Sequence, residues 1–147
     1  CELSQKEMSA EAERLIALRE RLKDGILTQL DDVQINGHAV ERLPGNLNMS
    51  FAYIEGESLL MGLKDIAVST GSACTSASLE PSYVLKAIGL ADELAYSAIR
   101  FGLGRFTSAE EIDYTVKRVV EEVARLRRIS PVYKAKKSQQ QLANAKQ

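Results

Sequence analysis

The chain contains 147 residues, 45% of them hydrophobic, and its 19 Lys and Arg against 20 Asp and Glu give a formal net charge of −1. This length suits one domain with a single core, and the charge balance lacks the basic excess of a nucleic-acid-binding domain. Apolar runs such as 59–63 are far shorter than the roughly 20 residues that cross a membrane, and the opening residues do not resemble a secretory signal. Cys1 and Cys74 supply neither a disulfide framework nor a metal-site spacing. We expect an intracellular domain of the cytoplasm or of an organelle matrix, without nucleic-acid or membrane partners.

Residues 1–30 are predicted to form a long amphipathic helix, because apolar residues recur at steps of three or four and charges occupy the other faces. Asp31-Asp32 ends that pattern, Val33 and Ile35 alternate with polar residues as in a short strand, and Asn36-Gly37 turns the chain. The apolar positions of the helix are Met8, Ala12, Leu15, Leu18, Leu22, Ile26 and Leu30.

The middle of the chain predicts a second strand and a short helix. Apolar residues alternate with small or polar ones over 47–53, which indicates a sheet with one buried face. Helical spacing follows over 59–63, where either Ser58 caps the helix or Glu57 favours its positive end. The apolar run 66–68 is expected to be a buried strand. His38, the only histidine, lies on a polar loop and is expected to be solvated rather than catalytic.

The last third predicts two helices, a strand and a polar tail. A helix with Pro81 in its first turn ends before Gly89, and the alternation over 99–103 is typical of a strand. A capping-box pattern opens a C-terminal helix over 108–129, whereas 134–147 is too polar to pack and is expected to be disordered. The sum is an α+β domain whose three- or four-stranded sheet has helices packed on one side.

Cys74 is the first candidate for chemistry. It lies in a segment, 69–78, that has no large or charged residue, so we expect a mobile loop and an exposed thiol. Structural free cysteines are usually buried. Exposure therefore suits a nucleophile that travels, although an incidental thiol on a flexible loop fits the same residues, and no nearby cation indicates a lowered pKa.

Arg100 is the second candidate. If Ile99 and Phe101 point into the core, Arg100 points to the opposite face beside Gly102, where a guanidinium can bind a carboxylate. A salt bridge or a solvated arginine fits the same pattern. Arg105, in the loop that follows, is expected to be structural or exposed at the rim. No lysine lies in a setting suited to Schiff-base chemistry, and no phosphate-binding loop occurs.

Four motifs follow one another in order along the chain: LPGNLNMSF at 43–51, EGESLL at 55–60, STGSAC at 69–74 and SAIRFGLGRFT at 97–107. Together they closely resemble the C-terminal part of a cysteine desulfurase of the housekeeping iron–sulfur cluster assembly type. The resemblance covers residues 1–133. It implies the small C-terminal domain of the aminotransferase class V architecture, a fold type I enzyme that depends on pyridoxal phosphate (PLP).

The resemblance also implies a reaction and two site residues. The full enzymes convert L-cysteine to L-alanine and pass the sulfur to an acceptor, such as an iron–sulfur scaffold protein. Cys74 matches the loop cysteine that becomes a persulfide, and this match also makes it a candidate transient ligand of a cluster; otherwise no metal site is expected. Arg100 matches the arginine that holds the substrate carboxylate.

The resemblance further implies that this chain lacks part of the enzyme. The lysine motif that anchors PLP, the histidine over its ring and the aspartate at its nitrogen belong to the large domain and do not occur here. We expect no cofactor-binding residue in this chain, no PLP bound to it alone and no activity without its large domain, through which the full enzymes form homodimers. Within 1–133 we expect a linking helix over 1–30, the mobile catalytic-cysteine loop over 69–80 and the C-terminal helix over 108–129. Tyr96 stands where many members have histidine, and the tail after 133 differs from their longer endings.

Three alternatives remain. The same site can cleave selenocysteine in the full enzyme, so the chain could belong to a selenocysteine lyase. The domain could also be a non-catalytic sulfur-relay or docking module in which Cys74 accepts sulfur from another protein. A redox pair of Cys74 with Cys1 is disfavoured, because Cys1 begins the long helix and nothing places it near the loop.

Overall fold

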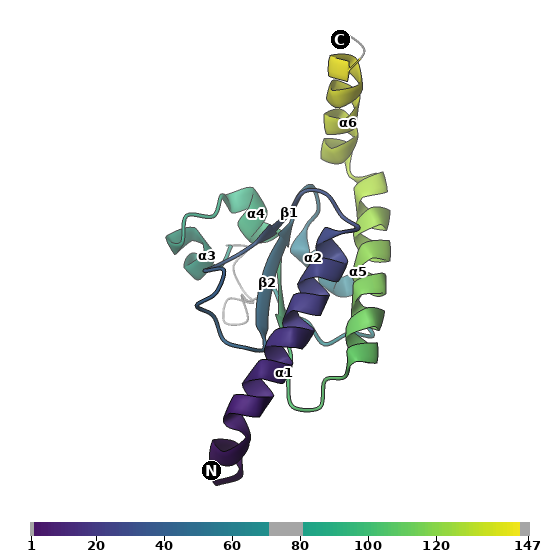
Figure 1. Ribbon diagram of the computed structural model, residues 1–147. Coiled ribbons are helices and arrows are strands. Elements are labelled where there is room, and N and C mark those ends of the chain that lie inside the picture. The colour runs from purple at the N-terminus through teal and green to yellow at the C-terminus, as the bar shows by residue number, and fades with distance from the viewer. Residues whose placement is uncertain (1, 71–80, 145–147) are drawn as a thin grey trace.

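Three antiparallel strands and six helices build the part of the chain that the computed structural model describes, residues 2–70 and 81–144 (Figure 1). The strands lie in the order β1-β2-β3. The elements are α1 (Glu2–Leu27), β1 (Val33–Ile35), β2 (Asn46–Phe51), α2 (Gly56–Gly62), α3 (Tyr83–Ala87), α4 (Asp92–Tyr96), β3 (Ala98–Gly102), α5 (Ala109–Ile129) and α6 (Pro131–Asn144).

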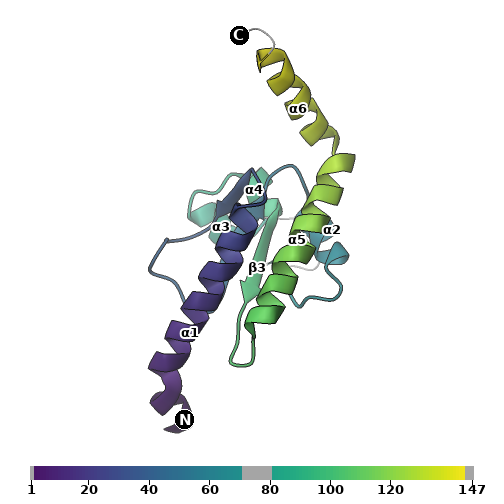
Figure 2. The same cartoon turned by 45° about the vertical axis from the view of Figure 1, so that its right-hand side comes forward.

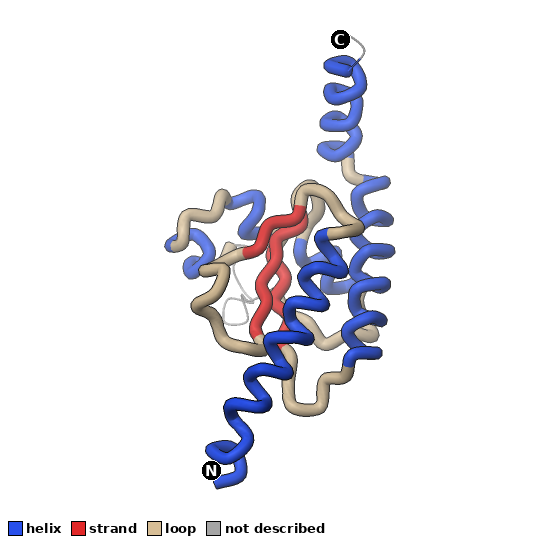
Figure 3. Tube along the Cα trace, in the orientation of Figure 1, coloured by secondary structure: helices blue, strands red, loops and turns tan. Residues whose placement is uncertain are grey.

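The central strand β2 carries the alternation that the sequence predicts. Met49 is opposite Ile35 of β1 and Ile99 of β3, and these side chains lie on one face of the sheet with Leu47 and Phe51. On that face Leu47, Met49, Phe51 and Ile99 are at most 1% exposed. Figure 3 shows the three strands as one twisted layer behind α1. The predicted α+β class is confirmed.

The apolar face of the sheet is covered by α1, α2 and α5. Figure 2 shows α1 and α5 side by side along β3. Each helix contributes one stripe to a single core, because residues three or four positions apart share a helix face. The buried helical members of this core are Leu18, Leu22 and Ile26 of α1, Leu59 of α2, and Ile112, Val116, Val119, Val123 and Leu126 of α5.

The opposite face of the sheet is not bare, which corrects the expectation of helices on one side only. The short helices α3 and α4 cover part of it, and the sequence predicted α3 but not α4. A second, smaller apolar cluster joins Leu85, Leu90 and Ala95 to Ala98 of β3. The rest of this face is polar and forms the wall described below.

Residues 66–68 do not form the predicted strand, because only Ser69 pairs with the sheet, through a single bridge to Arg100. This run of three residues was too short for periodicity to assign. At α2 the structure agrees with the second of the two predicted alternatives: Ser58 does not cap the helix, whereas Glu57 lies in its first turn, near its positive end. The N-cap is Glu55, whose side chain makes no cap hydrogen bond.

Helix ends and turns follow their predicted chemistry more closely. At the start of α5 the Ser108 side chain accepts from the Glu111 N–H, and the Glu111 carboxylate accepts from the Ser108 N–H. Gly89 follows α3 with φ of +86°, and Gly37 turns the chain after β1 with φ of +85°.

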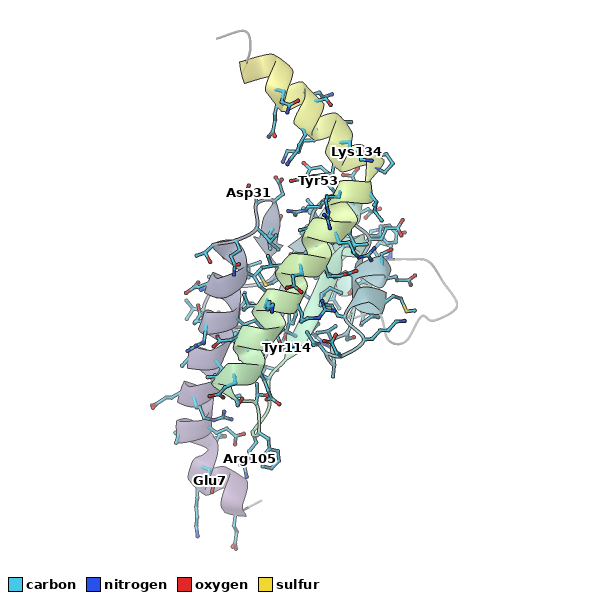
Figure 4. All side chains as sticks on the ribbon, turned by 90° about the vertical axis from the view of Figure 1, so that its right-hand side faces the viewer. Glu7, Asp31, Tyr53, Arg105, Tyr114 and Lys134 are labelled. Carbon is cyan, nitrogen blue, oxygen red and sulfur yellow. The ribbon has the colours of Figure 1, made fainter. Side chains whose placement is uncertain are left out.

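Residues 131–144 correct the expectation of a disordered tail, because they form α6. Pro131 occupies the first helical position, where its missing N–H costs no hydrogen bond. The base of α6 is held to the domain by Tyr133, whose ring centroid lies 5.7 Å from that of Tyr53, and by an ion pair between Lys136 and Asp32. Figure 4 shows Tyr53, Asp31 and Lys134 near this junction.

The loop after β3 is tied to α1. Arg105 pairs with Glu7 at 3.2 Å and with Glu11 at 2.7 Å, and Arg105 and Glu7 lie close together in Figure 4. Arg14 donates from the same helix to the carbonyls of Gly104, Arg105 and Thr107. Arg105 was expected to be structural or exposed at the rim, and it is both.

Candidate functional site

Arg100 lies at the centre of β3 and points away from the core. Its neighbours Ile99 and Phe101 are 0% and 3% exposed on the apolar face, whereas Arg100 is exposed on the polar face. Within the described ranges no carboxylate pairs with its guanidinium. Strand geometry therefore produces the orientation that the sequence predicted, with the guanidinium on the polar face.

Asn36, Asn48 and Arg100 form a row across the three strands. Asn48 of β2 is directly opposite Arg100 of β3, and the Asn36 N–H, just past the end of β1, donates to the Asn48 carbonyl at 2.9 Å. Side chains directly opposite each other in an antiparallel pair lie on the same face, with Cβ atoms about 4.5–5.5 Å apart. The row therefore gathers two amides and a guanidinium at one level of the sheet.

A chain of side-chain hydrogen bonds fixes the amides of this row. The Asn36 amide nitrogen donates to Asn48 Oδ1 at 2.6 Å and to Ser50 Oγ at 2.8 Å. The Ser50 hydroxyl in turn donates to the Leu94 carbonyl of α4 at 2.7 Å. Asn36 is only 5% exposed, and its Oδ1 atom is buried without a partner.

A cavity of about 400 Å³ opens above this row. Its volume falls within the range of small-molecule sites. Leu43, Val84, Leu85 and Ile88 give it an apolar side. Its polar wall contains Asn36, Asn46, Asn48, Thr70, Ser82 and Arg100.

Both ends of the segment that carries Cys74 are at this cavity. Ser69 is bound to Arg100 through two backbone hydrogen bonds, of 2.6 and 3.2 Å. Thr70 and Ser82 line the cavity on either side of residues 71–80. Cys74 itself, with residues 71–80 of the predicted loop, lies outside the described residues.

A second cation at the cavity, Arg42, is engaged in local structure. Arg42 donates to the carbonyls of His38, Asn36 and Gly37 and so holds the loop between β1 and β2. Burial lowers the pKa of Arg42, and Glu41 contributes a carboxylate to the same wall.

His38 also has a local role. It is exposed, as predicted, and its Nδ1 atom accepts from the N–H groups of Val40 and Glu41 at 3.2 and 2.8 Å. This nitrogen is therefore an acceptor occupied by the backbone. The geometry gives His38 a turn-stabilising role.

The cavity walls do not fit a PLP anchor. A Schiff base needs a lysine directed into the site, and the described wall contains none. Lys23, Lys86 and Lys136 instead form ion pairs with carboxylates elsewhere.

Two further cavities, of about 460 and 470 Å³, lie along α5 and do not include Arg100. In residues 2–70 and 81–144 no three His, Cys, Asp or Glu side chains are grouped to hold a metal. Over those same ranges, no helix has both the length and the apolar character to cross a membrane.

The aminotransferase class-V family profile matches residues 2–115. The chain belongs to this family. The match includes the whole polar row and the Cys74 segment, and it ends within α5.

Two cysteine desulfurases are highly similar to this chain. A cysteine desulfurase IscS from Anaeromyxobacter sp. (strain Fw109-5) is 61% identical over 90% of this chain and 33% of its own length. A human cysteine desulfurase is 57% identical over 90% of this chain and 29% of its own length. The resemblance stated from the motifs is confirmed, and the chain spans about a third of the relatives that it matches.

A solved structure described as a NifS-like protein shares the fold, with a TM-score of 0.72 and 29% identity. It covers 85% of this chain, which corresponds to 31% of that protein. The predicted class V architecture is confirmed. The division into a linking helix, loop and C-terminal helix of one small domain stays a prediction.

Sequence reasoning did not identify Asn36 and Asn48 as members of the site. Asn48 does alternate with Leu47 and Met49, so its direction could have been predicted. Its position beside Arg100 depends on the register of β2 and β3, which the alternation alone leaves open.

Proposed function

We propose that this chain is the C-terminal part of a PLP-dependent cysteine desulfurase that converts L-cysteine to L-alanine. Cys74 takes the sulfur as a persulfide, and Arg100 binds the substrate carboxylate. In the complete enzyme PLP supplies the electron sink for this chemistry. The similarity to cysteine desulfurases supports the proposal.

One observation of this chain carries the proposal. Thr70 and Ser82, on either side of the Cys74 segment, line the same cavity as Arg100. Cys74 follows Thr70 by four residues, a reach of up to about 14 Å at about 3.5 Å per residue. A substrate held by Arg100 is therefore within reach of the Cys74 thiol.

The overall transfer balances. The Cys74 thiolate attacks the substrate sulfur, a sulfur–sulfur bond forms and the carbon–sulfur bond breaks. The carbon fragment keeps the electron pair, gains a proton and leaves as L-alanine, while Cys74 holds the added sulfur. A second thiol later removes that sulfur and regenerates Cys74.

Partners follow from the same proposal. The sulfur passes to an iron–sulfur scaffold or another acceptor protein, and the complete enzyme is a homodimer joined through its large domain. A free catalytic thiol needs a reducing compartment, such as the bacterial cytoplasm or an organelle matrix. Selenocysteine is a second substrate that the same site would accept.

The experiment measures L-alanine formed from L-cysteine with PLP and a reductant. The chain is assayed alone, and also joined to the part of the Anaeromyxobacter relative that it does not match, each beside its Cys74→Ser variant. We expect alanine only from the joined protein with Cys74 intact. Alanine from the isolated chain would refute the need for the large domain.

The same assay separates the alternatives. Equal alanine formation by the joined protein and its Cys74→Ser variant would refute the persulfide role. A joined protein that makes no alanine, while the chain takes up sulfur on Cys74 from a second desulfurase, would replace the proposal with a sulfur-relay module. Alanine from selenocysteine but not from cysteine would indicate a selenocysteine lyase.

A further inference from the structure

We propose that Asn48 gives the substrate carboxylate a second N–H donor beside Arg100, and that Asn36 is the positioning residue that orients the Asn48 amide. This inference rests on the proposed function, because it names a further group in that substrate site. It follows from the direction of each hydrogen bond in the polar row.

The direction of these hydrogen bonds is set by the Leu94 carbonyl of α4. This carbonyl can only accept, so the Ser50 hydroxyl must donate its single hydrogen to it. Ser50 Oγ can then only accept from Asn36, which must present its NH₂ group. The opposite orientation of the Asn36 amide would place two acceptors against each other.

The same NH₂ group fixes Asn48. Asn36 Nδ2 lies 2.6 Å from the Asn48 side chain, so Asn48 must present its carbonyl oxygen there. Asn36 is 5% exposed, which prevents water from replacing this bond. These hydrogen bonds from Leu94 through Ser50 and Asn36 to Asn48 form a relay. In this arrangement Asn36 Oδ1 is buried and unpaired, and an unpaired buried acceptor costs free energy.

The Asn48 NH₂ group is consequently directed away from Asn36. The strand order β1-β2-β3 places Asn48 between Asn36 and Arg100, and Asn48 lines the cavity with Arg100. A carboxylate has about four lone-pair sites, of which an arginine fork uses two. Asn48 is placed to donate to a third.

The test compares two acid substitutions in the complete enzyme. Asn48→Asp keeps an oxygen for the Asn36 NH₂ group but replaces the donor with a negative charge. Asn46→Asp is the matched control, because Asn46 lies on the same face of β2 and lines the same cavity, two residues away. Both are assayed with L-alanine and ethylamine as inhibitors, since ethylamine is alanine without its carboxylate.

We expect Asn48→Asp to raise the inhibition constant of L-alanine by about tenfold or more, as the loss of a charge-assisted hydrogen bond implies. The inhibition constant of ethylamine should change by less than about twofold, because ethylamine has no carboxylate for Asn48 to bind. Asn46→Asp should change the inhibition constants of both compounds by less than about threefold. Equal losses for the two inhibitors, or equal effects of the two variants, would overturn the proposal.

A double-mutant cycle tests the positioning role of Asn36. Asn36→Leu removes the NH₂ group that orients Asn48 without adding a charge, so it should raise the inhibition constant of L-alanine selectively in the wild-type background. The same change should have no further effect on that constant in an Asn48→Ala background, because Asn36 acts through Asn48. Additive effects would contradict this role.

A binding measurement on the 147-residue chain needs no activity. The side-chain amide signals of Asn48 and Asn46 are followed by nuclear magnetic resonance while sodium acetate replaces sodium chloride at constant ionic strength. The Asn48 signal should shift and the Asn46 signal should not, and equal shifts would refute the inference. A missing Cys74-dependent activity would instead refute the proposed function. If Asn48→Asp does not fold, Asn48→Ala replaces it with the same selective loss expected.

Discussion

Replacement of Arg127 by methionine should destabilise the domain strongly. Arg127 lies on α5 and is 4% exposed. Its guanidinium donates to the carbonyls of Asp31, Asp32 and Ala52 at 2.7, 3.1 and 3.2 Å. It therefore joins α5 to the turn before β1 and to the residue after β2.

The expected magnitude follows from these three bonds. Hydrogen bonds to a charged group contribute about 1.5–3 kcal/mol each, so their sum sets an upper bound of about 4.5–9 kcal/mol. Burial lowers the pKa of Arg127, which shows that its charge is desolvated, and methionine would not bear that cost. The carbonyls of the exposed Asp31 and Asp32 can also regain water. We expect Arg127→Met to lower the free energy of unfolding by about 2–4 kcal/mol.

Urea unfolding of the chain measures this loss. Arg128→Met is the matched control, because Arg128 is the exposed neighbour on the same helix turn, and we expect a change within about 0.5 kcal/mol. Amide exchange should also become faster in β1 and α6, since the Arg127 guanidinium lies 5.5 Å from the ring centroid of Tyr133. Equal losses for the two methionine variants would refute the reasoning.

Three further predictions concern stability. A Cβ on Gly56 would lie 2.7 Å from a backbone oxygen, so Gly56→Ala should lower the free energy of unfolding in urea by about 1–3 kcal/mol. A Cβ on Gly104 would meet nothing within 4 Å, so Gly104→Ala should be neutral or stabilising by up to about 1 kcal/mol. The Arg118 hydrogen bond is the main cause that lowers the pKa of Asp65 from 3.8 to about 2, so Asp65 stabilises the fold above pH 3.8 and loses this effect as the pH falls toward 2. Asp65→Asn should therefore lower the melting temperature near neutral pH, and a difference that does not shrink on acidification would contradict the assignment. Ser108→Ala removes the cap of α5 and should cost about 1 kcal/mol in thermal unfolding.

The apolar half of the fold could be predicted from local patterns. The alternation over 47–51 and the capping box at Ser108 each specify structure within a few residues, and both appear as predicted. The run at 66–68 and the polar tail were mispredicted for different reasons. The run is too short for its period to be read, whereas α6 is held by distant partners, including Asp32, that composition does not reveal.

Arg127 shows the same limit within a well-predicted helix. It lies four residues after Val123, on the buried stripe of α5, and this spacing was a signal that it faces inward. A charged residue in that position is normally assigned to the solvent side. Only the three carbonyls brought together by the turns around β1 and β2 make its burial favourable.

The candidate site divides in a similar way between local and long-range information. The direction of Arg100 follows from the strand alternation, and the structure agrees. Its cavity depends on the loop 36–42 and on α3, which are distant in sequence. The persulfide role of Cys74 and the carboxylate role of Arg100 stay predictions, which the variants above test.

The two faces of the sheet are linked through β1. This strand has three residues, Val33–Ile35, too few for stable pairing without other support. Arg127 holds the turn that precedes it, and Asn36 follows it directly and begins the relay to Asn48. A loss of the Arg127 contacts should therefore loosen Asn36 as well as the core. It follows that Arg127→Met should weaken the binding of L-alanine to the complete enzyme more than the binding of ethylamine, although Arg127 touches neither ligand. Gly104→Ala should leave the ratio of the two inhibition constants unchanged.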